Sequence, residues 1–214
     1  MSGVRPSHPT LFVVGALVAL GASACASRGP QTVAPGEVTT ARVARRTVGD
    51  VLASWPEKQR ETATMLVGKY GEPTVVGDGM IAWFNTGPFV KTVLLRHGQP
   101  HNFPMPHVDY LTQTVKHTVP ANKLDELYQY DGSVWFHRTR GELSAQCDKE
   151  EMNFLALNLA HDVITGKRSV SDARAFYAKT AMAFKQGDRS SPYVTGLIFQ
   201  TEPNAADPDH PHQM

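Results

Sequence analysis

The stretch MIAWFNTGPFVKTVLLR, residues 80–96, decides the fold that we expect. Its two ends, Met80–Phe84 and Phe89–Arg96, are rich in the β-branched and aromatic residues that strands favour. The tetrapeptide NTGP lies between them, and Asn, Gly and Pro are typical of turns. The spacing predicts an antiparallel hairpin, so we expect an antiparallel sheet at the centre of the domain.

The rest of the folded part adds helices on either side of further strands. A leading helix is predicted over Pro56–Lys69, because proline suits the first helical turn and the Gly-Glu-Pro that follows stops a helix. The next predicted elements, in chain order, are a strand over Val108–Val119, a short helix over Ala121–Tyr130, and strands over Val134–Arg138 and Gly141–Gln146.

Two helices are expected to close the domain. Asp148 and Glu151 form a D-x-x-E variant of the capping box at the start of the first, which Gly166 ends. Ser169 or Ser171 caps the second. Strands and helices do not alternate regularly, which favours the α+β class: a small antiparallel sheet with a leading helix and two C-terminal helices packed on it.

Length and charge restrict the class of protein further. The 214 residues are enough for one domain, which we place at 51–200, with flanking segments. Lys and Arg number 21 against 20 Asp and Glu, a formal charge of +1. Because no basic surplus is present to hold a phosphate backbone, the composition argues against a nucleic-acid partner.

The N-terminus has the layout of a secretory signal peptide. Its apolar run, Leu11–Leu20, is shorter than the ~20 residues that a membrane-spanning helix needs. Two interpretations stay open. Ala22-Ser23-Ala24 satisfies the small-x-small rule of ordinary signal peptidase, whereas the same residues followed by Cys25 resemble the lipobox of bacterial lipoproteins, although Ala22 stands where that family usually has Leu. We predict a signal peptide over 1–24 and lipid on Cys25.

The segments that flank the domain are predicted to lack a fold. Residues 25–50 carry prolines and glycines without helical periodicity, and are expected to be a flexible tether behind the lipidated cysteine. Residues 201–214 are polar and Pro-rich and are expected to be a disordered tail. By resemblance to sorted lipoproteins, Ala26 after the cysteine implies the outer membrane, with the membrane itself as a partner through the lipid.

Two motifs resemble an uncharacterised family of bacterial envelope proteins: HNFPMPH at 101–107 and RTRGELSAQCDKEEMNFLALNLAHD at 138–162. With KYGEP at 69–73 and TGKRSV at 165–170, the likeness extends over about 55–199. It implies no activity, because none is assigned to that family. Separately, the helix and hairpin of Pro56–Arg96 are similar in plan to small outer-membrane lipoprotein domains of the BamE type, which implies a fold only.

Histidines supply the candidate metal ligands. His107 and Asp109 are alternate residues of a predicted strand and so share a face, ~6.6 Å apart, which makes them the predicted pair. His101 joins them only if the chain doubles back, because an extended, polyproline-like segment would separate the two imidazoles by roughly 19 Å. Structural or surface roles are the alternative, since no HExxH or repeated CxxC pattern accompanies these residues.

The first closing helix carries a second candidate face, opposite its apolar one. This second face contains Glu150, Glu151, Asn158, His161 and Asp162, together with Phe154. A solvated side is the simpler interpretation, and a face that lines a cleft is the other. Cys147 precedes this helix, where the dipole favours a thiolate. A buried structural thiol is nevertheless favoured, because the sequence places no histidine base beside it.

Two functions from different classes are consistent with these patterns. The first is a non-catalytic envelope lipoprotein whose domain binds a protein or another envelope component through a protruding surface made of His101, Phe103, His107 and Asp109. The alternative is a small metal-dependent hydrolase or metal-binding protein that uses His107 and Asp109, with Glu151 or Asp162 as base. A thiol enzyme at Cys147 is a third possibility, and a divalent metal is the only cofactor considered.

Overall fold

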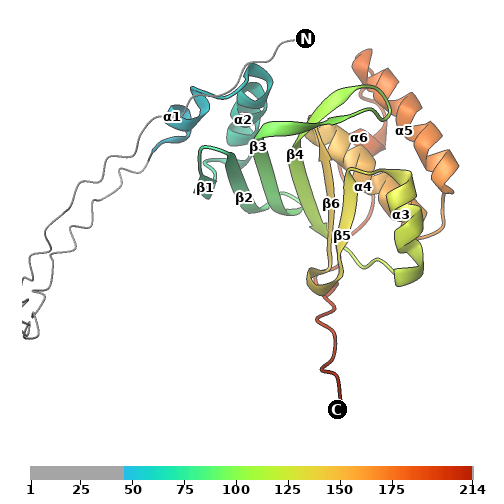
Figure 1. The fold of residues 1–214 in the computed structure, drawn as a ribbon. Helices are drawn as coiled ribbons and strands as arrows, with labels where there is room; N and C mark the ends of the chain where they lie inside the picture. The colour runs from blue at the N-terminus through green and yellow to red at the C-terminus, as the bar shows by residue number, and fades with distance from the viewer. Residues whose placement is uncertain (1–45, 214) are drawn as a thin grey trace, which may run out of the picture. The chain divides into compact units, whose positions relative to one another are not determined.

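The computed structural model describes residues 46–213, so the predicted signal peptide, Cys25 and most of the expected tether lie outside the described residues (Figure 1). A single six-stranded sheet forms the centre, in the order β1-β2-β3-β4-β6-β5, and every neighbouring pair is antiparallel. Its strands are β1 (Val75–Val76), β2 (Met80–Thr86), β3 (Phe89–His101), β4 (His107–Lys116), β5 (Val134–His137) and β6 (Glu142–Cys147). The antiparallel α+β prediction is confirmed.

Helices precede, interrupt and follow these strands. They are α1 (Val48–Leu52), α2 (Glu57–Tyr70), the 3-10 turns η1 (Ala121–Lys123) and η2 (Arg138–Arg140), α3 (Leu124–Tyr130), α4 (Glu150–Ile164), α5 (Val170–Lys185) and α6 (Pro192–Thr195). The predicted hairpin is β2 and β3, and the predicted leading helix is α2. No helix of the described residues is long and apolar enough to cross a membrane.

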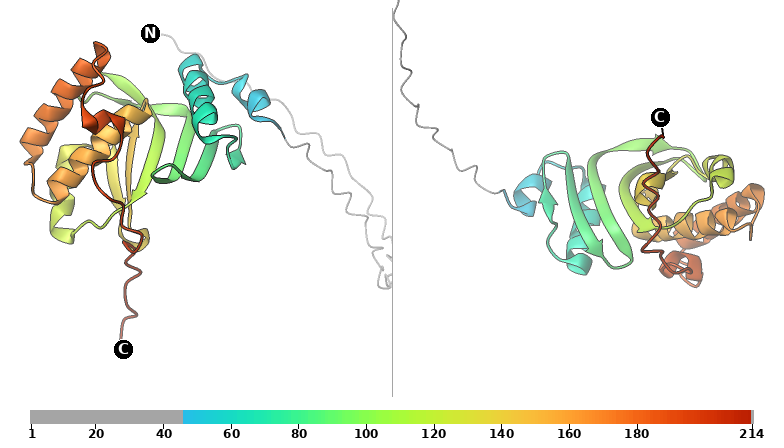
Figure 2. Two further views of the ribbon diagram at one scale, coloured as in Figure 1. Left: turned by 180° about the vertical axis from the view of Figure 1, so that it is seen from behind. Right: turned by 90° about the horizontal axis from the view of Figure 1, so that it is seen from below.

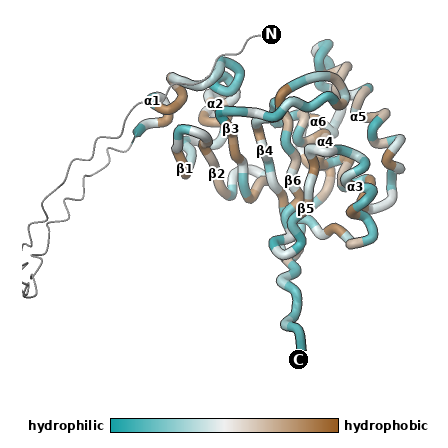
Figure 3. The backbone as a smooth tube through the Cα atoms, viewed as in Figure 1, coloured by the Kyte–Doolittle hydropathy of each residue, from teal (hydrophilic) through white to brown (hydrophobic). Residues whose placement is uncertain are grey.

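The helices form layers against the sheet (Figures 1 and 2). Helix α4 packs on β4, β5 and β6, whereas α5 packs mainly on α3 and α4 and so forms an outer layer. Helix α2 covers β3 and encloses a smaller core, in which Leu66 meets Ile81 and Trp83. A larger core surrounds α4. Figure 3 shows the hydrophobic residues concentrated in the strands and inner helices, while the C-terminal end is hydrophilic.

Helix α4 is more deeply buried than its sequence pattern indicates. Thirteen of its fifteen residues are buried, since the sheet lies on one side and α5 and α6 lie on others. The predicted solvated or cleft-lining face is therefore wrong for Glu150, Asn158 and Asp162, each under 5% exposed. The predicted capping box is also wrong, because Lys149 is the N-cap and makes no side-chain hydrogen bond there.

Both ends of the described chain are more structured than expected. Thr47 caps α1 with a reciprocal capping box, inside the stretch predicted to be tether. Residues 202–207, expected to be disordered, instead lie against the sheet: the Glu202 amide donates to the Lys116 carbonyl at 3.0 Å, and Ala205 is buried. Gly141 permits this contact, because a Cβ there would lie 2.2 Å from the Ala205 carbonyl carbon.

Candidate metal centre

The β3–β4 connection brings the predicted ligands together. His101 ends β3, His107 begins β4, and the two are register partners across the ladder. The chain therefore doubles back over residues 102–106, and the imidazole centroids lie 5.1 Å apart rather than at the separation of an extended segment. Asp109 follows His107 on the same side of β4. Ligand atoms of His101, His107 and Asp109 all lie within 4.8 Å of one another.

His107 is oriented by a backbone carbonyl. Its Nδ1 lies 2.8 Å from the Met105 carbonyl oxygen, and since a carbonyl only accepts, Nδ1 carries a proton and donates. The other nitrogen, Nε2, is turned toward Asp109 Oδ1 at 2.9 Å and Cys147 Sγ at 3.4 Å. This arrangement presents Nε2 to the interior of the cluster.

His101 is oriented in the same manner by a carboxylate. Its Nε2 lies 3.6 Å from Asp131 Oδ1, and its Nδ1 lies 3.1 Å from Asp109 Oδ2. Asp131 is buried at the end of α3 and also accepts a hydrogen bond from the Ser133 amide at 2.8 Å. Each imidazole thus uses one nitrogen to fix its orientation and directs the other toward Asp109.

Asp109 is the buried centre of the cluster, with only 1% of its surface exposed. Its Oδ2 accepts a hydrogen bond from the Ser133 hydroxyl. Among the described residues no hydrogen bond to Oδ1 meets the usual geometry, although His107 Nε2 lies 2.9 Å away as an ion-pair partner. A buried carboxylate oxygen without a donor is costly, so Oδ1 needs a positive charge beside it, which a protonated His107 or a bound cation would supply.

The electrostatics of the cluster favour a positive charge. The Asp109 carboxylate, followed by Cys147, raises the pKa of His107 to about 11, although burial opposes this shift. Burial raises the pKa of Asp131. Burial likewise raises the pKa of the Cys147 thiol, and the neighbouring His107 acts against that change. The interactions with Asp109 and Cys147 therefore outweigh desolvation at His107.

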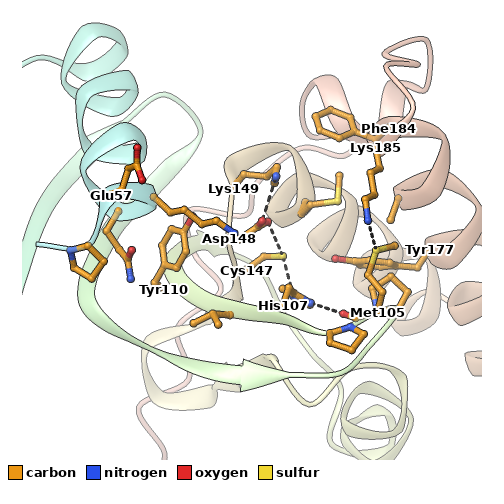
Figure 4. A pocket seen from close by; sticks show the side chains of 18 of the residues that line it. Glu57, Met105, His107, Tyr110, Cys147, Asp148, Lys149, Tyr177, Phe184 and Lys185 are labelled. Carbon is orange, nitrogen blue, oxygen red and sulfur yellow. Dashed lines mark hydrogen bonds and ion pairs between the residues drawn. The ribbon is translucent and has the colours of Figure 1, made fainter.

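A pocket of about 650 Å³ opens beside the cluster, and His107 and Cys147 form part of its wall (Figure 4). In Figure 4 the dashed lines run from Met105 through His107 and Cys147 to Asp148. The aromatic side chains of Tyr177 and Phe184 also line the pocket. The pocket also has charged residues: the cations Lys58, Lys149, Lys185 and Arg189, and the acids Glu57 and Asp148.

Phe103 lies inward rather than outward. Its ring packs 5.2 Å from that of Tyr177, and the Arg174 guanidinium carbon lies 3.8 Å from its centroid. Phe103 is half-buried against the larger core. The expectation that the HNFPMPH segment presents a protruding aromatic is therefore wrong, because the hairpin folds over α5.

The candidate residues of α4 belong to separate structural networks. Asp162 accepts hydrogen bonds from Tyr193 at 2.6 Å and Arg168 at 3.0 Å, and also pairs with Lys167. Asn158 donates to the carbonyls of Tyr193 and Gly196, and so anchors α6. Neither residue lies in the group formed by His101, His107 and Asp109. Asp162, predicted as a catalytic base, is fully buried in this network, and Glu151 is half-buried beside Glu150.

His161 contacts the C-terminal segment. Its Nδ1 lies 2.9 Å from His117 Nε2, and its ring stacks on Phe199 with centroids 4.5 Å apart. Burial, and next the neighbouring His117, lower the pKa of His161; Lys167 adds to this effect, while Asp162 and Glu202 oppose it.

We therefore expect the free energy of unfolding to fall as the pH drops below the unfolded-state pKa of about 6.5. The folded state binds a proton on His161 less well than the unfolded state does, so protonation favours unfolding. In His161→Phe, which keeps an aromatic ring against Phe199, denaturant titrations should show a smaller loss of stability between neutral and acidic pH. An unchanged pH dependence would contradict this assignment.

Three parts of the cluster could not be predicted from the sequence. Asp131 and Ser133 come from the turn between α3 and β5, and no local pattern links them to residues 101–109. The contact between Cys147 and His107 was also missed, although the register of β4 and β6 brings Cys147 opposite Leu111, two residues beyond Asp109. Predicting that Cys147 lies beside His107 would have required knowing that β6 pairs with β4.

The fold and cluster define an antiparallel α+β protein in which two partly exposed histidines surround one buried carboxylate. Comparison with known proteins adds no family: no protein-family model matches the chain, and neither a curated protein nor a solved structure is similar to it. The resemblance to an envelope-protein family accordingly stays a prediction.

Proposed function

We propose that this protein binds a divalent transition metal ion through His101, His107 and Asp109, and that zinc is the ion that matches the site best. The observation that carries the proposal is Asp109 Oδ1, a buried carboxylate oxygen that accepts no hydrogen bond although two imidazoles face its carboxylate. A cation among these three side chains would supply the missing partner.

The distances support this proposal. Nitrogen and oxygen ligands about 2.0 Å from a tetrahedral zinc ion lie about 3.3 Å from each other. In the cluster, the distances from imidazole nitrogen to carboxylate oxygen are 2.9 Å for His107 and 3.1 Å for His101. Small side-chain movements would therefore admit the ion. The Met105 carbonyl accepts from Nδ1 of His107, and the Asp131 carboxylate lies 3.6 Å from Nε2 of His101. Such partners on the ring nitrogen that faces away from the ion are typical of histidines that ligate metals.

The ligand types distinguish among metals. Ca²⁺ and Mg²⁺ favour oxygen ligands, whereas imidazole nitrogen suits zinc and other transition metals. Two imidazoles and one carboxylate thus favour a transition metal, and this set of ligands holds zinc in some proteins and non-haem Fe(II) in others. We propose binding rather than hydrolysis, because Asp162 is held by Arg168 and Tyr193 and lies outside the cluster.

The location proposed for this metal-binding domain is the bacterial envelope. The signal-peptide pattern and Cys25 support export and lipid attachment, and Ala26 supports the outer membrane. Binding of another envelope component remains a further proposal, which rests on this location. The inward position of Phe103 removes the protruding aromatic on which the predicted docking surface depended.

The experiment is a zinc titration of the protein, purified without a histidine tag and freed of metal with a chelator. We expect near-stoichiometric binding in competition with a chromophoric chelator. We also expect a gain in stability of about 2.7 kcal/mol when free zinc is 100 times its dissociation constant. Ca²⁺ and Mg²⁺ at the same concentrations should have little effect. A folded protein that neither binds zinc nor gains stability would contradict the proposal.

A further inference from the structure

The geometry points to Cys147 as the fourth ligand of this metal, which would make the site a closed Cys-His-His-Asp zinc site rather than one with an open position. This inference rests on the proposed function and extends it, because it specifies a thiophilic metal and the role of a buried cysteine.

The sheet brings the sulfur to the cluster. Cys147 is the last residue of β6 and pairs with Leu111 of β4. Paired residues of neighbouring strands place their side chains on the same side of the sheet, and so do alternate residues of one strand. Cys147 pairs with Leu111, and Asp109 lies two residues before Leu111, so Cys147 and Asp109 are diagonal neighbours on one side of the sheet. His107 lies two residues before Asp109 on β4, and so its side chain is on that side too.

The separation between Cys147 and His107 fits a shared zinc ion, whereas Sγ lies outside the group of ligand atoms that are all within 4.8 Å of one another and would have to move toward His101 and Asp109. With bonds of about 2.3 Å to sulfur and about 2.0 Å to nitrogen, a thiolate and an imidazole on one tetrahedral zinc lie about 3.5 Å apart. The distance from Cys147 Sγ to His107 Nε2 is 3.4 Å. A cation between the thiolate and Asp109 Oδ1, which lies 2.9 Å from the same nitrogen, would contact all three atoms.

The charges also balance. Zinc binding would form a Zn–S bond and a bond from zinc to His107 Nε2, and would release to solvent both the thiol proton and the Nε2 proton of the charged imidazole. The ion then carries two positive charges against one each on Asp109 and Cys147, while the two histidines are neutral ligands. Because Cys147 is 4% exposed and Asp109 is 1% exposed, a neutral assembly avoids the cost of burying an unpaired charge.

A fourth protein ligand determines what the site can do. Structural zinc sites are closed by four protein ligands, whereas catalytic sites keep one position for water or substrate. The Cys147 sulfur and the His107 ring both form part of the pocket wall, so two of the four ligands would lie between the ion and the pocket. Any molecule that reaches the metal from the pocket would have to displace one of them.

The test uses the full chain and zinc alone as the probe. Alkylation of Cys147 by iodoacetamide is measured with and without one equivalent of zinc, and peptide mapping separates Cys147 from Cys25. We expect zinc to slow the labelling of Cys147 at least tenfold. Cobalt in place of zinc should give the near-ultraviolet charge-transfer absorption of a cobalt–thiolate bond, and Cys147→Ser should abolish that absorption.

The affinity of the variant provides a second measure. Loss of a partner that only positions a ligand typically costs 10–100-fold in affinity, so Cys147→Ser should weaken zinc binding by more than about 100-fold. His97→Ala, at an exposed histidine, is the matched control and should bind as the wild type does. If zinc binds but leaves labelling unchanged and cobalt gives no thiolate band, the Cys147 inference is overturned while the three-ligand site stands. If the wild-type protein binds no zinc, both proposals fail.

Discussion

Asp109→Asn is expected to lower the zinc affinity of the protein by more than about 100-fold, since it removes a ligand rather than a residue that positions one. Asparagine keeps the size of the side chain and can still accept the Ser133 hydrogen bond. It removes the negative charge that faces both imidazoles, and a neutral amide is a poor zinc ligand. Competition titration measures the loss, and circular dichroism shows that the variant is folded.

The control is again His97→Ala, which removes an exposed histidine outside the cluster. It tests whether histidine content alone explains zinc binding. If Asp109→Asn binds zinc as tightly as the wild type does, the ion is held elsewhere, and the arrangement of His101, His107 and Asp109 has only a structural role.

Glu150→Ala should reduce the free energy of unfolding by about 3 kcal/mol, the size expected when one partner of a buried ionic network is removed. The Glu150 carboxylate accepts hydrogen bonds from the Tyr70 hydroxyl and from the Gln113 amide, both at 2.6 Å, and also pairs with the Lys69 ammonium. Truncation leaves the fully buried Gln113 amide without this acceptor. It also removes the hydrogen bond and the ion pair that join Tyr70 and Lys69 of α2 to α4.

The neighbouring residue supplies a matched control. Glu151 is half-buried on the same helical turn, and its side chain makes no hydrogen bond or ion pair among residues 46–213. Glu151→Ala should therefore change the free energy of unfolding by less than about 0.5 kcal/mol in urea titrations. Equal losses in the two variants would show that the network around Glu150 contributes no more than helix propensity.

Local sequence patterns predicted the longer elements of the fold, but not the short elements α1, β1 and α6 or the extension of β3 to His101. The turn residues between Phe84 and Phe89 predict the central hairpin, and Pro56 and Gly71 mark the two ends of α2. These features depend on neighbours in the chain, which is why a single sequence reveals them. The burial of α4 was missed because it depends on α5 and α6 covering polar positions such as Asn158.

The candidate site was predicted only in part, for a similar reason. The alternation of His107 and Asp109 is local and follows from strand geometry. The approach of His101 depends on the reversal of residues 102–106, and the approach of Cys147 depends on β6 pairing with β4. Strand order is a property of the whole domain, so spacing along the chain cannot show which distant residues meet.

The most direct measurement is a crystal structure of the zinc-loaded protein, with anomalous difference maps from data collected above and below the zinc absorption edge. We predict one strong peak within about 2.3 Å of ligand atoms from His101, His107 and Asp109. A peak at a different set of side chains, or none at this cluster in a protein that had been saturated with zinc, would contradict the account.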